Sequence, residues 1–231
     1  MSPSSRQRST RDRPAKAPLS QDAIVDAALA ILTSEGLEAV TMRRVAAALD
    51  TGPASLYVWV SGREGLLQAM EDRIVSTVEL EEPDPARWRA QLHALLLRTR
   101  QALVDHPGIA AATMAEPPRS ESTLLLVENM LGILLAGGLD PQDVAWAADI
   151  FALLVSYAAM EADVRHADAQ QQAAELYTSF TSLSPERFPL ITAHAAQLVA
   201  GDAEQRFHVA IDFVVDGMLA RVAPPRPGDN Q

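Results

Sequence analysis

Apolar residues recur three and four positions apart along almost the whole chain, which is the spacing of one face of an α-helix and not the alternation of a β-strand. The first such run covers residues 24–32. It follows Ser20, which can cap a helix, and precedes Gly36, which can end one in a left-handed conformation. Since no repeat of fixed period accompanies this pattern, the sequence predicts an all-α protein.

Two short helices and a longer one are expected next. Thr41 can cap a helix over residues 42–49, and Pro53 can open another that runs to about Val60. The polar, proline-bearing cluster at 50–53 separates them. A further helix is expected over 63–80, so that residues 20–80 form one domain.

The acidic, proline-bearing segment 81–85 is the predicted boundary to a larger part of the chain. Helical patterns follow at 86–105, shortly after Pro107, and at 120–136, 141–166, 169–179, 185–199 and 202–222. This number of helices is typical of a bundle, which we place at residues 81–223. Residues 124–126 and 150–160 are apolar on more than one face, which predicts a bundle that associates with a second copy. Residues 1–19 are expected to be a disordered basic arm, and 224–231 a disordered tail.

Composition narrows the class of protein. The chain has 231 residues, 48% of them apolar, and no cysteine, so disulfides, thiolate metal sites and cysteine nucleophiles are excluded. The beginning of the chain is polar, and the longest uncharged apolar stretch, 150–160, is shorter than the roughly 18 residues that a membrane span requires. We therefore expect a cytoplasmic protein without a membrane segment.

The distribution of charge matters more than its sum. The formal net charge is −11, which by itself argues against a nucleic-acid partner. Residues 1–76, however, balance their basic and acidic side chains, and the negative excess lies entirely in residues 77–231. Cationic surface is therefore available in the first domain.

Residues 41–60 have the layout of a helix-turn-helix, in which a second short helix can enter the major groove of DNA. Once the apolar positions of both helices face inward, the side chains left outside are Arg43, Arg44, Ser55, Tyr57 and Trp59. Arginine can contact phosphate or guanine, serine a base edge or phosphate, and tyrosine combines a hydroxyl with a flat apolar ring. Two plainer interpretations stay open: the arginines could form a solvated helix face, and the two aromatic residues could belong to the core.

The string TMRRVAAALDTGPASLYVWVSGREGLLQAM, from Thr41, resembles the DNA-binding domain of the TetR family of bacterial transcriptional repressors. The likeness spans Ser20 to Ile74. The later part is similar to the tetracycline-repressor-like branch through the region of Trp88 and the strings DHPGIA, LVENM and ERFPLITAHAAQLVAGDAEQRF. The resemblance implies an N-terminal three-helix DNA-binding domain with a connecting helix, followed by a bundle for ligand binding and dimerisation.

The resemblance also implies roles for individual residues. Arg43 would read a base, Thr41 and Arg44 would touch the DNA backbone, and Arg63 would clamp a phosphate. The groove would be lined by Gly52, Ala54, Ser55, Tyr57 and Trp59. Two positions depart from the family pattern, which usually has glycine at the place of Asp50 and histidine at that of Trp59. Aspartate tolerates a left-handed turn, and tryptophan can pack against sugar or a thymine methyl group.

An effector cavity inside the bundle is the second site that the resemblance implies. Candidates that combine apolar area with a few polar groups are Trp88, Thr99, Thr113, Met130, Trp146, Phe151 and Tyr157. Taken singly, each of them is more often plain core than part of a ligand site. The scarcity of cationic groups in this part favours a neutral or cationic apolar effector over a polyanion. We expect no metal and no cofactor, because the five histidines are scattered, and no catalytic motif marks an enzyme.

Two hypotheses of different class follow. In the first, the protein is a homodimeric repressor that a small-molecule effector releases from a palindromic operator, and the helices at 141–166 and 202–222 form the dimer interface. In the second, it is a helical carrier or sequestering protein that has lost operator recognition, as the departures at Asp50 and Trp59 would suggest.

Overall fold

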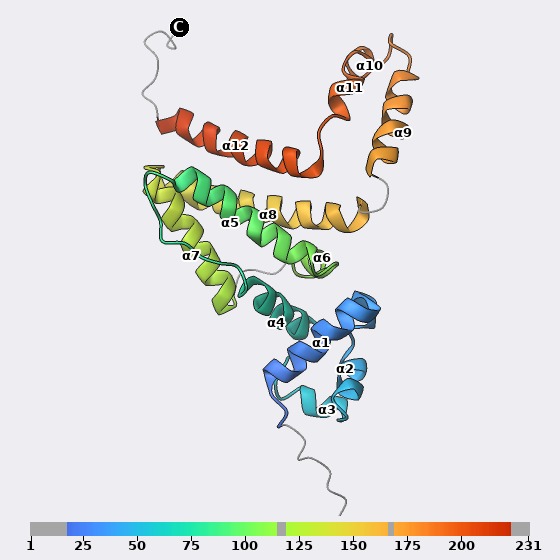
Figure 1. The fold of residues 1–231 in the computed structure, drawn as a ribbon, viewed down its shortest axis with the longest axis vertical. Helices are drawn as coiled ribbons and strands as arrows, with labels where there is room; N and C mark the ends of the chain where they lie inside the picture. The colour runs from blue at the N-terminus through green and yellow to red at the C-terminus, as the bar shows by residue number, and fades with distance from the viewer. Residues whose placement is uncertain (1–17, 115–118, 166–168, 223–231) are drawn as a thin grey trace, which may run out of the picture.

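The computed structural model describes residues 18–114, 119–165 and 169–222. Over these ranges the chain forms twelve α-helices and one short 3₁₀-helix, with no β-strand (Figure 1). The expectation of an all-α protein is confirmed.

Four helices and a 3₁₀ turn build the first compact unit. They are α1 (Gln21–Glu35), η1 (Leu37–Ala39), α2 (Met42–Ala48), α3 (Pro53–Leu56) and α4 (Arg63–Val75). Both predicted caps are confirmed, since the hydroxyl oxygen of Ser20 accepts from the backbone N–H of Ala23 at 3.2 Å and that of Thr41 from Arg44 at 3.1 Å. Fully buried side chains such as Ile24, Val45 and Leu56 join these helices in one core.

Two helices of this unit are shorter than the sequence suggested. The third ends at Leu56 instead of Val60, because the next four residues are aromatic or β-branched and lose side-chain freedom in a helix. The fourth ends at Val75 instead of residue 80. There the hydroxyl groups of Ser76 and Thr77 donate to the carbonyl oxygens of Arg73 and Ile74, both at 2.7 Å, and so occupy the last acceptors of the helix.

The second unit is a bundle built around a long central helix. Its main members are α5 (Trp88–Val104), α6 (Ile109–Thr113), α7 (Glu121–Ala136), α8 (Pro141–Arg165) and α12 (Ala203–Val222). Helix α5 packs against both α7 and α8, and α12 lies along α8 (Figure 1). Leu92, Leu95, Ile133, Phe151 and Ile211 are fully buried where these helices meet.

Helix α12 is also joined to α5 by polar side chains. Arg89 of α5 contacts Asp212 at 2.7 Å and Asp216 at 2.8 Å. One turn further along, the Nδ1 atoms of His93 and His208 lie 3.0 Å apart, so one ring donates to the other. These contacts set the position of α12 relative to the centre of the bundle.

Three helices project from the bundle as an arm: α9 (Ala169–Thr181), α10 (Pro189–Ala193) and α11 (Ala195–Leu198) (Figure 1). They pack mainly against one another. The single helix expected at 185–199 is wrong: the helix begins only at Pro189 and is interrupted at His194, whose backbone (φ −113°, ψ 17°) leaves helical geometry.

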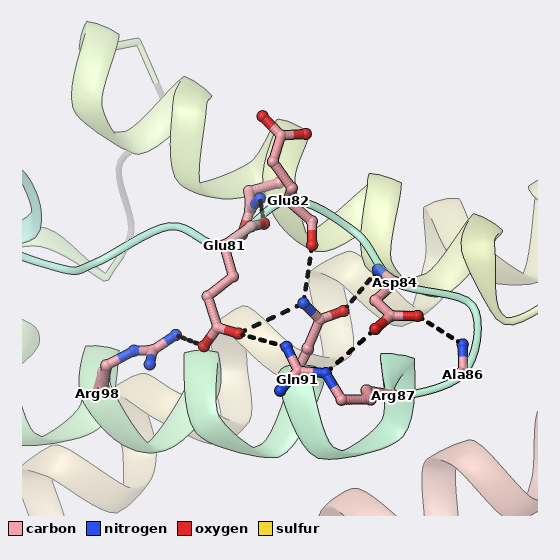
Figure 2. A network of polar contacts seen from close by, with 8 residues as sticks. Glu81, Glu82, Asp84, Ala86, Arg87, Gln91 and Arg98 are labelled. Carbon is pink, nitrogen blue, oxygen red and sulfur yellow. Dashed lines mark hydrogen bonds and ion pairs between the residues drawn. The ribbon is translucent and has the colours of Figure 1, made fainter.

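The segment between α4 and α5 is held by what we call the linker latch, made of Glu81, Asp84, Arg87, Gln91 and Arg98 (Figure 2). Arg98 donates to the Glu81 carboxylate at 3.0 Å, and the Gln91 amide donates to the Glu82 carbonyl oxygen at 2.8 Å. The Glu81 carbonyl oxygen in turn accepts from Asn129 of α7 at 2.8 Å. The latch therefore fixes the chain between the two units onto α5 and α7.

Helix α8 is apolar over a longer segment than its longest uncharged run, 150–160, suggests. Its segment Pro141–Ala162, 22 residues long, has the length and mean hydropathy of a membrane span, and 39% of its most apolar window is buried within the chain. A core helix of a water-soluble bundle has the same properties, and α8 packs against α5, α7 and α12. Its composition is therefore weak evidence for a membrane.

Candidate nucleic-acid interface and bundle cavity

The turn between α2 and α3 is compact and left-handed at one residue. Asp50 has φ 49°, within the region that glycine adopts most easily, and among the described residues it is the one non-glycine with positive φ. The backbone N–H groups of Asp50 and Thr51 donate to Ala47 and Ala46 of α2. The departure from glycine at this position thus preserves the turn.

The face of α2 and α3 that points away from the core carries most of the predicted DNA-contacting side chains. Arg43, Gly52, Ala54, Ser55, Tyr57 and Trp59 are all exposed. The alternative that Tyr57 and Trp59 are core residues is wrong, because their side chains are 58% and 43% exposed. Val58, which was not among the predicted contacts, lies between them in sequence and is 81% exposed, so it adds apolar area to this surface.

The remaining three predicted DNA contacts are already engaged within the domain. Thr41 caps α2, and Arg44 forms a bidentate pair with Glu35, whose pKa is lowered by this hydrogen bond. Arg63 donates from Nε to the carbonyl oxygen of Val40 at 3.1 Å and from Nη2 to that of Leu37 at 3.4 Å. Arg63 therefore ties the start of α4 to the connection between α1 and α2, a role that the sequence did not indicate.

A cavity of about 570 Å³ lies inside the bundle, bounded by α4 on one side and by α5, α6, α7 and α8 on the others. Four of the seven residues expected at an effector site line it: Thr99, Thr113, Met130 and Phe151. All four are at least nine-tenths buried, and Leu95 and Val155 complete an apolar interior. This size and character are typical of small-molecule sites.

The other three candidates lie elsewhere. Trp88 packs against the backbone of Gly137, where even a Cβ atom would come within 2.5 Å of its ring. Trp146 and Tyr157 are on the outer face of α8, and their side chains are largely exposed. The prediction that these three residues line the cavity is wrong.

Charged residues of the cavity were not foreseen. Glu71 and Asp72 of α4 line its wall, while the exposed side chains of Arg119, Glu121 and Asp149 lie around it. Burial raises the pKa of Glu71 above that of an ordinary glutamate. Asp72 accepts from the backbone N–H of Ser122 at 3.1 Å and so holds the first turn of α7.

The next residue of α4 faces the first unit. Arg73 contacts Asp26 at 2.7 Å and Asp22 at 2.5 Å, both on α1. Three consecutive residues of α4 therefore reach the cavity, the first turn of α7, and α1.

An apolar stripe runs along the outer face of α8. It consists of Trp146, Ile150, Leu153 and Tyr157, spaced four, three and four residues apart, all exposed in the single chain. On α12, Val209 and Phe213 are exposed as well, Phe213 to 75%. Such a surface on two long adjacent helices is typical of an interface with another protein chain.

Among the described residues, no group of three or more histidine, aspartate or glutamate side chains is placed to hold a metal ion. The basic arm of the sequence analysis, residues 1–19, lies outside the described residues except for its last two.

Sequence models of two families match the chain. The model described as "Bacterial regulatory proteins, tetR family" matches residues 24–70, and "Tetracyclin repressor-like, C-terminal domain" matches residues 82–222. The HTH-type transcriptional repressor DrrR1 of Streptomyces coeruleorubidus is 31% identical, over 94% of this chain and 84% of that protein. An HTH-type transcriptional regulator of Saccharopolyspora erythraea is 28% identical, over 87% of this chain and 85% of that protein.

Solved structures agree with these matches. The TetR family protein ActR of Streptomyces coelicolor, in complex with (S)-DNPA, has a TM-score of 0.82 and 32% identity, covering 90% of this chain and 100% of that one. Its complex with actinorhodin has the same TM-score and 33% identity, over 89% of this chain and 97% of that one. With both halves matched in sequence and the whole architecture matched in space, the chain belongs to the TetR family of bacterial transcriptional regulators.

Proposed function

We propose that this protein is a cytoplasmic, homodimeric transcriptional repressor that a small-molecule effector releases from a palindromic operator. The observation that carries the proposal is the solvent-facing surface of α2, α3 and the turn that follows α3, where Arg43, Tyr57 and Trp59 are exposed. Exposed aromatic rings do not contribute to the buried core, but together with an arginine they can contact base edges, sugars and thymine methyl groups.

Individual roles follow from the exposed chemistry. Arg43 reads a base edge, and Ser55, Tyr57, Val58 and Trp59 fill the major groove beside it. Gly52 and Ala54 are small enough to let the DNA backbone approach. Thr41 and Arg44 contact phosphate at the edge of this surface, with Arg44 exchanging its partner Glu35 for the DNA.

The effector site is the cavity of about 570 Å³ between α4 and the bundle. That ActR was solved in complex with (S)-DNPA and with actinorhodin supports a small-molecule role for the equivalent part of this chain. Thr99 and Thr113 supply polar groups, and Met130 and Phe151 supply the apolar wall.

Dimerisation uses the apolar stripe on α8 together with α12. Two copies related by a two-fold axis would place each stripe against its counterpart and remove Tyr157, Leu153 and Phe213 from water. Two recognition helices held in this way can meet successive major grooves, so the symmetry of the dimer sets the spacing of the operator half-sites.

Release follows from the position of α4. This helix lines the cavity with Glu71, holds α7 through Asp72 and holds α1 through Arg73. An effector that binds more tightly when α4 is displaced shifts the population toward dimers whose recognition helices no longer fit the operator. Its differential affinity for the two arrangements sets the size of the effect.

The experiment that tests the proposal is selection of bound fragments from a random DNA pool by the purified protein at moderate salt. We expect a two-fold symmetric consensus. Arg43→Ala should reduce discrimination at one position of each half-site by about 1–3 kcal/mol. The control Arg187→Ala removes the same charge from the arm, far from α2 and α3, and should leave the consensus unchanged.

Absence of any enriched sequence, with a protein that is folded and dimeric, would overturn the repressor proposal and favour the helical carrier. A consensus that survives Arg43→Ala without loss at any position would instead remove the base-reading role of Arg43 alone.

A further inference from the structure

The cavity has an unusual balance of charge for a site walled by apolar side chains. Among the described residues, four carboxyl groups line it, from Glu71, Asp72, Glu121 and Asp149, against one guanidinium, that of Arg119. Helices α5 and α6 contribute only uncharged residues to the lining. This excess of carboxyl groups over cations favours a cationic ligand over an anionic one.

Of these carboxyl groups, Glu71 and Asp72 lie within the wall, and Asp72 also holds another helix. Asp72 is bonded to the backbone of Ser122, while Glu121 and Asp149 are exposed at the rim. Glu71 is half-buried and lies next to Thr113, across the cavity from apolar residues of α5, α7 and α8.

The surroundings of Glu71 do little to stabilise its negative charge. Burial raises its pKa, and the neighbouring carboxylate of Asp72 acts in the same direction. Thr113 would lower the pKa by donating a hydrogen bond, but its single hydroxyl proton is also shared with the carbonyl oxygen of Ile109 at 2.9 Å. The described residues around Glu71 therefore stabilise its ionised form only weakly.

We propose that the effector is an amphipathic compound with a ring-sized apolar body and a protonated amine, and that the amine pairs with Glu71. The proposal rests on the repressor function proposed above and specifies the chemical class of its effector. The apolar body packs against Leu95, Met130 and Phe151, whose side chains are almost fully buried. The ammonium donates charge-assisted hydrogen bonds to the carboxylate, so it binds the ionised form of Glu71.

When the effector's amine pairs with Glu71, the effector contacts α4 directly, and α4 is the helix that leads to the DNA-binding unit. The residues after Glu71 are bonded to α7 and to α1. A cation bound at Glu71 therefore acts on the same turn of α4 whose residues contact α7 and α1.

The test uses three probes of equal size: aminomethylanthracene, hydroxymethylanthracene and anthracene carboxylic acid. Their binding to the purified full chain is followed by fluorescence. We expect the amine to bind about tenfold or more tighter than the alcohol, and the acid to bind most weakly. Glu71→Gln should remove the preference for the amine and leave the affinity for the alcohol within about threefold, since glutamine keeps the shape but not the charge.

Asp149→Asn is the matched control, because it removes one carboxylate from the exposed rim of the same cavity. It should weaken binding of the amine by less than about threefold, since exposed charges are screened. The affinity for the amine should also rise with pH as Glu71 ionises, because an aliphatic ammonium stays charged through neutral pH. This pH dependence should be absent for the alcohol and in Glu71→Gln.

Binding of the amine no tighter than the alcohol, including failure of both to bind, overturns the proposal. So does a preference for the amine that persists in Glu71→Gln. The selection of operator DNA is independent of these probes, so a regulator that binds DNA but shows no preference for a cation loses this proposal and keeps its proposed function.

Discussion

Arg44 and Arg63 lie on the surface of the DNA-binding unit, yet other parts of that unit hold both side chains. Arg63 bonds two backbone carbonyl groups, and Arg44 bonds Glu35. From the sequence, both arginines are expected to contact DNA, as Arg43 is, because a one-dimensional pattern does not show which acceptors the fold brings near. Asp50, by contrast, could be interpreted correctly, since the left-handed turn is a local property of a few residues.

The two hydrogen bonds that Arg63 donates to backbone carbonyl groups lead to a prediction about stability. Arg63→Ala should lower the free energy of unfolding by about 1 kcal/mol, because two backbone acceptors between α1 and α2 lose their donor. Arg43→Ala, on a solvated face, should leave it unchanged. Chemical denaturation of both variants measures the difference. Equal stability of the two proteins would contradict the structural role of Arg63.

Helices α3, α4 and α8 show what the pattern of apolar residues predicts at the level of an element. Their existence and inward faces follow from periodicity, but the ends of α3 and α4 depend on side-chain hydroxyl groups and on β-branched runs. That Trp146 and Tyr157 do not line the cavity could have been predicted from the geometry of a helix. At about 100° per residue, Trp146 and Tyr157 lie roughly 140° and 120° from Phe151, and so on another face of the helix. The position of Glu71 in the cavity wall could not be predicted from the sequence, because a carboxylate on an amphipathic helix is usually solvated.

The linker latch should make the protein sensitive to acid. The hydrogen bond from Arg98 lowers the pKa of Glu81, and the backbone N–H of Ala86, followed by Arg87, lowers that of Asp84. A carboxyl group with a lowered folded pKa stabilises the protein above its unfolded value, near 4, and this contribution is lost as the pH falls through the folded value. The melting temperature should therefore fall with pH below about 4.

Glu81→Gln tests this at one position, because glutamine keeps the size of the side chain and cannot titrate. The variant should have a lower melting temperature at neutral pH and a shallower decline in acid. Melting curves at a series of pH values measure both. A decline as steep as in the unchanged protein would assign the acid sensitivity to other carboxyl groups, such as Asp212, whose pKa Arg89 also lowers.

At the scale of the whole molecule, the apolar stripe on α8 and the exposed apolar residues of α12 form the proposed dimer interface. Phe213→Asp should produce monomers, because it places a charge within the proposed apolar interface. Sedimentation velocity measures the mass. Leu135→Asp, a similar change at an exposed position of α7 outside the stripe, should remain dimeric. Dimers of Phe213→Asp would place the interface elsewhere.

A monomer should also bind the operator far more weakly, since two linked half-sites become one.

Two faces of helix α8 have different surroundings. One face lines the cavity with Phe151 and Val155, and the other exposes Leu153 and Tyr157. In a dimer built on the outward face, each cavity is one helix thickness away from the other subunit. A compound that shifts α8 in one subunit then alters the helix against which its counterpart packs. Occupancy of the first cavity should therefore change the affinity of the second, and ligand titrations of the dimer should depart from a Hill coefficient of one, while those of the Phe213→Asp monomer should not.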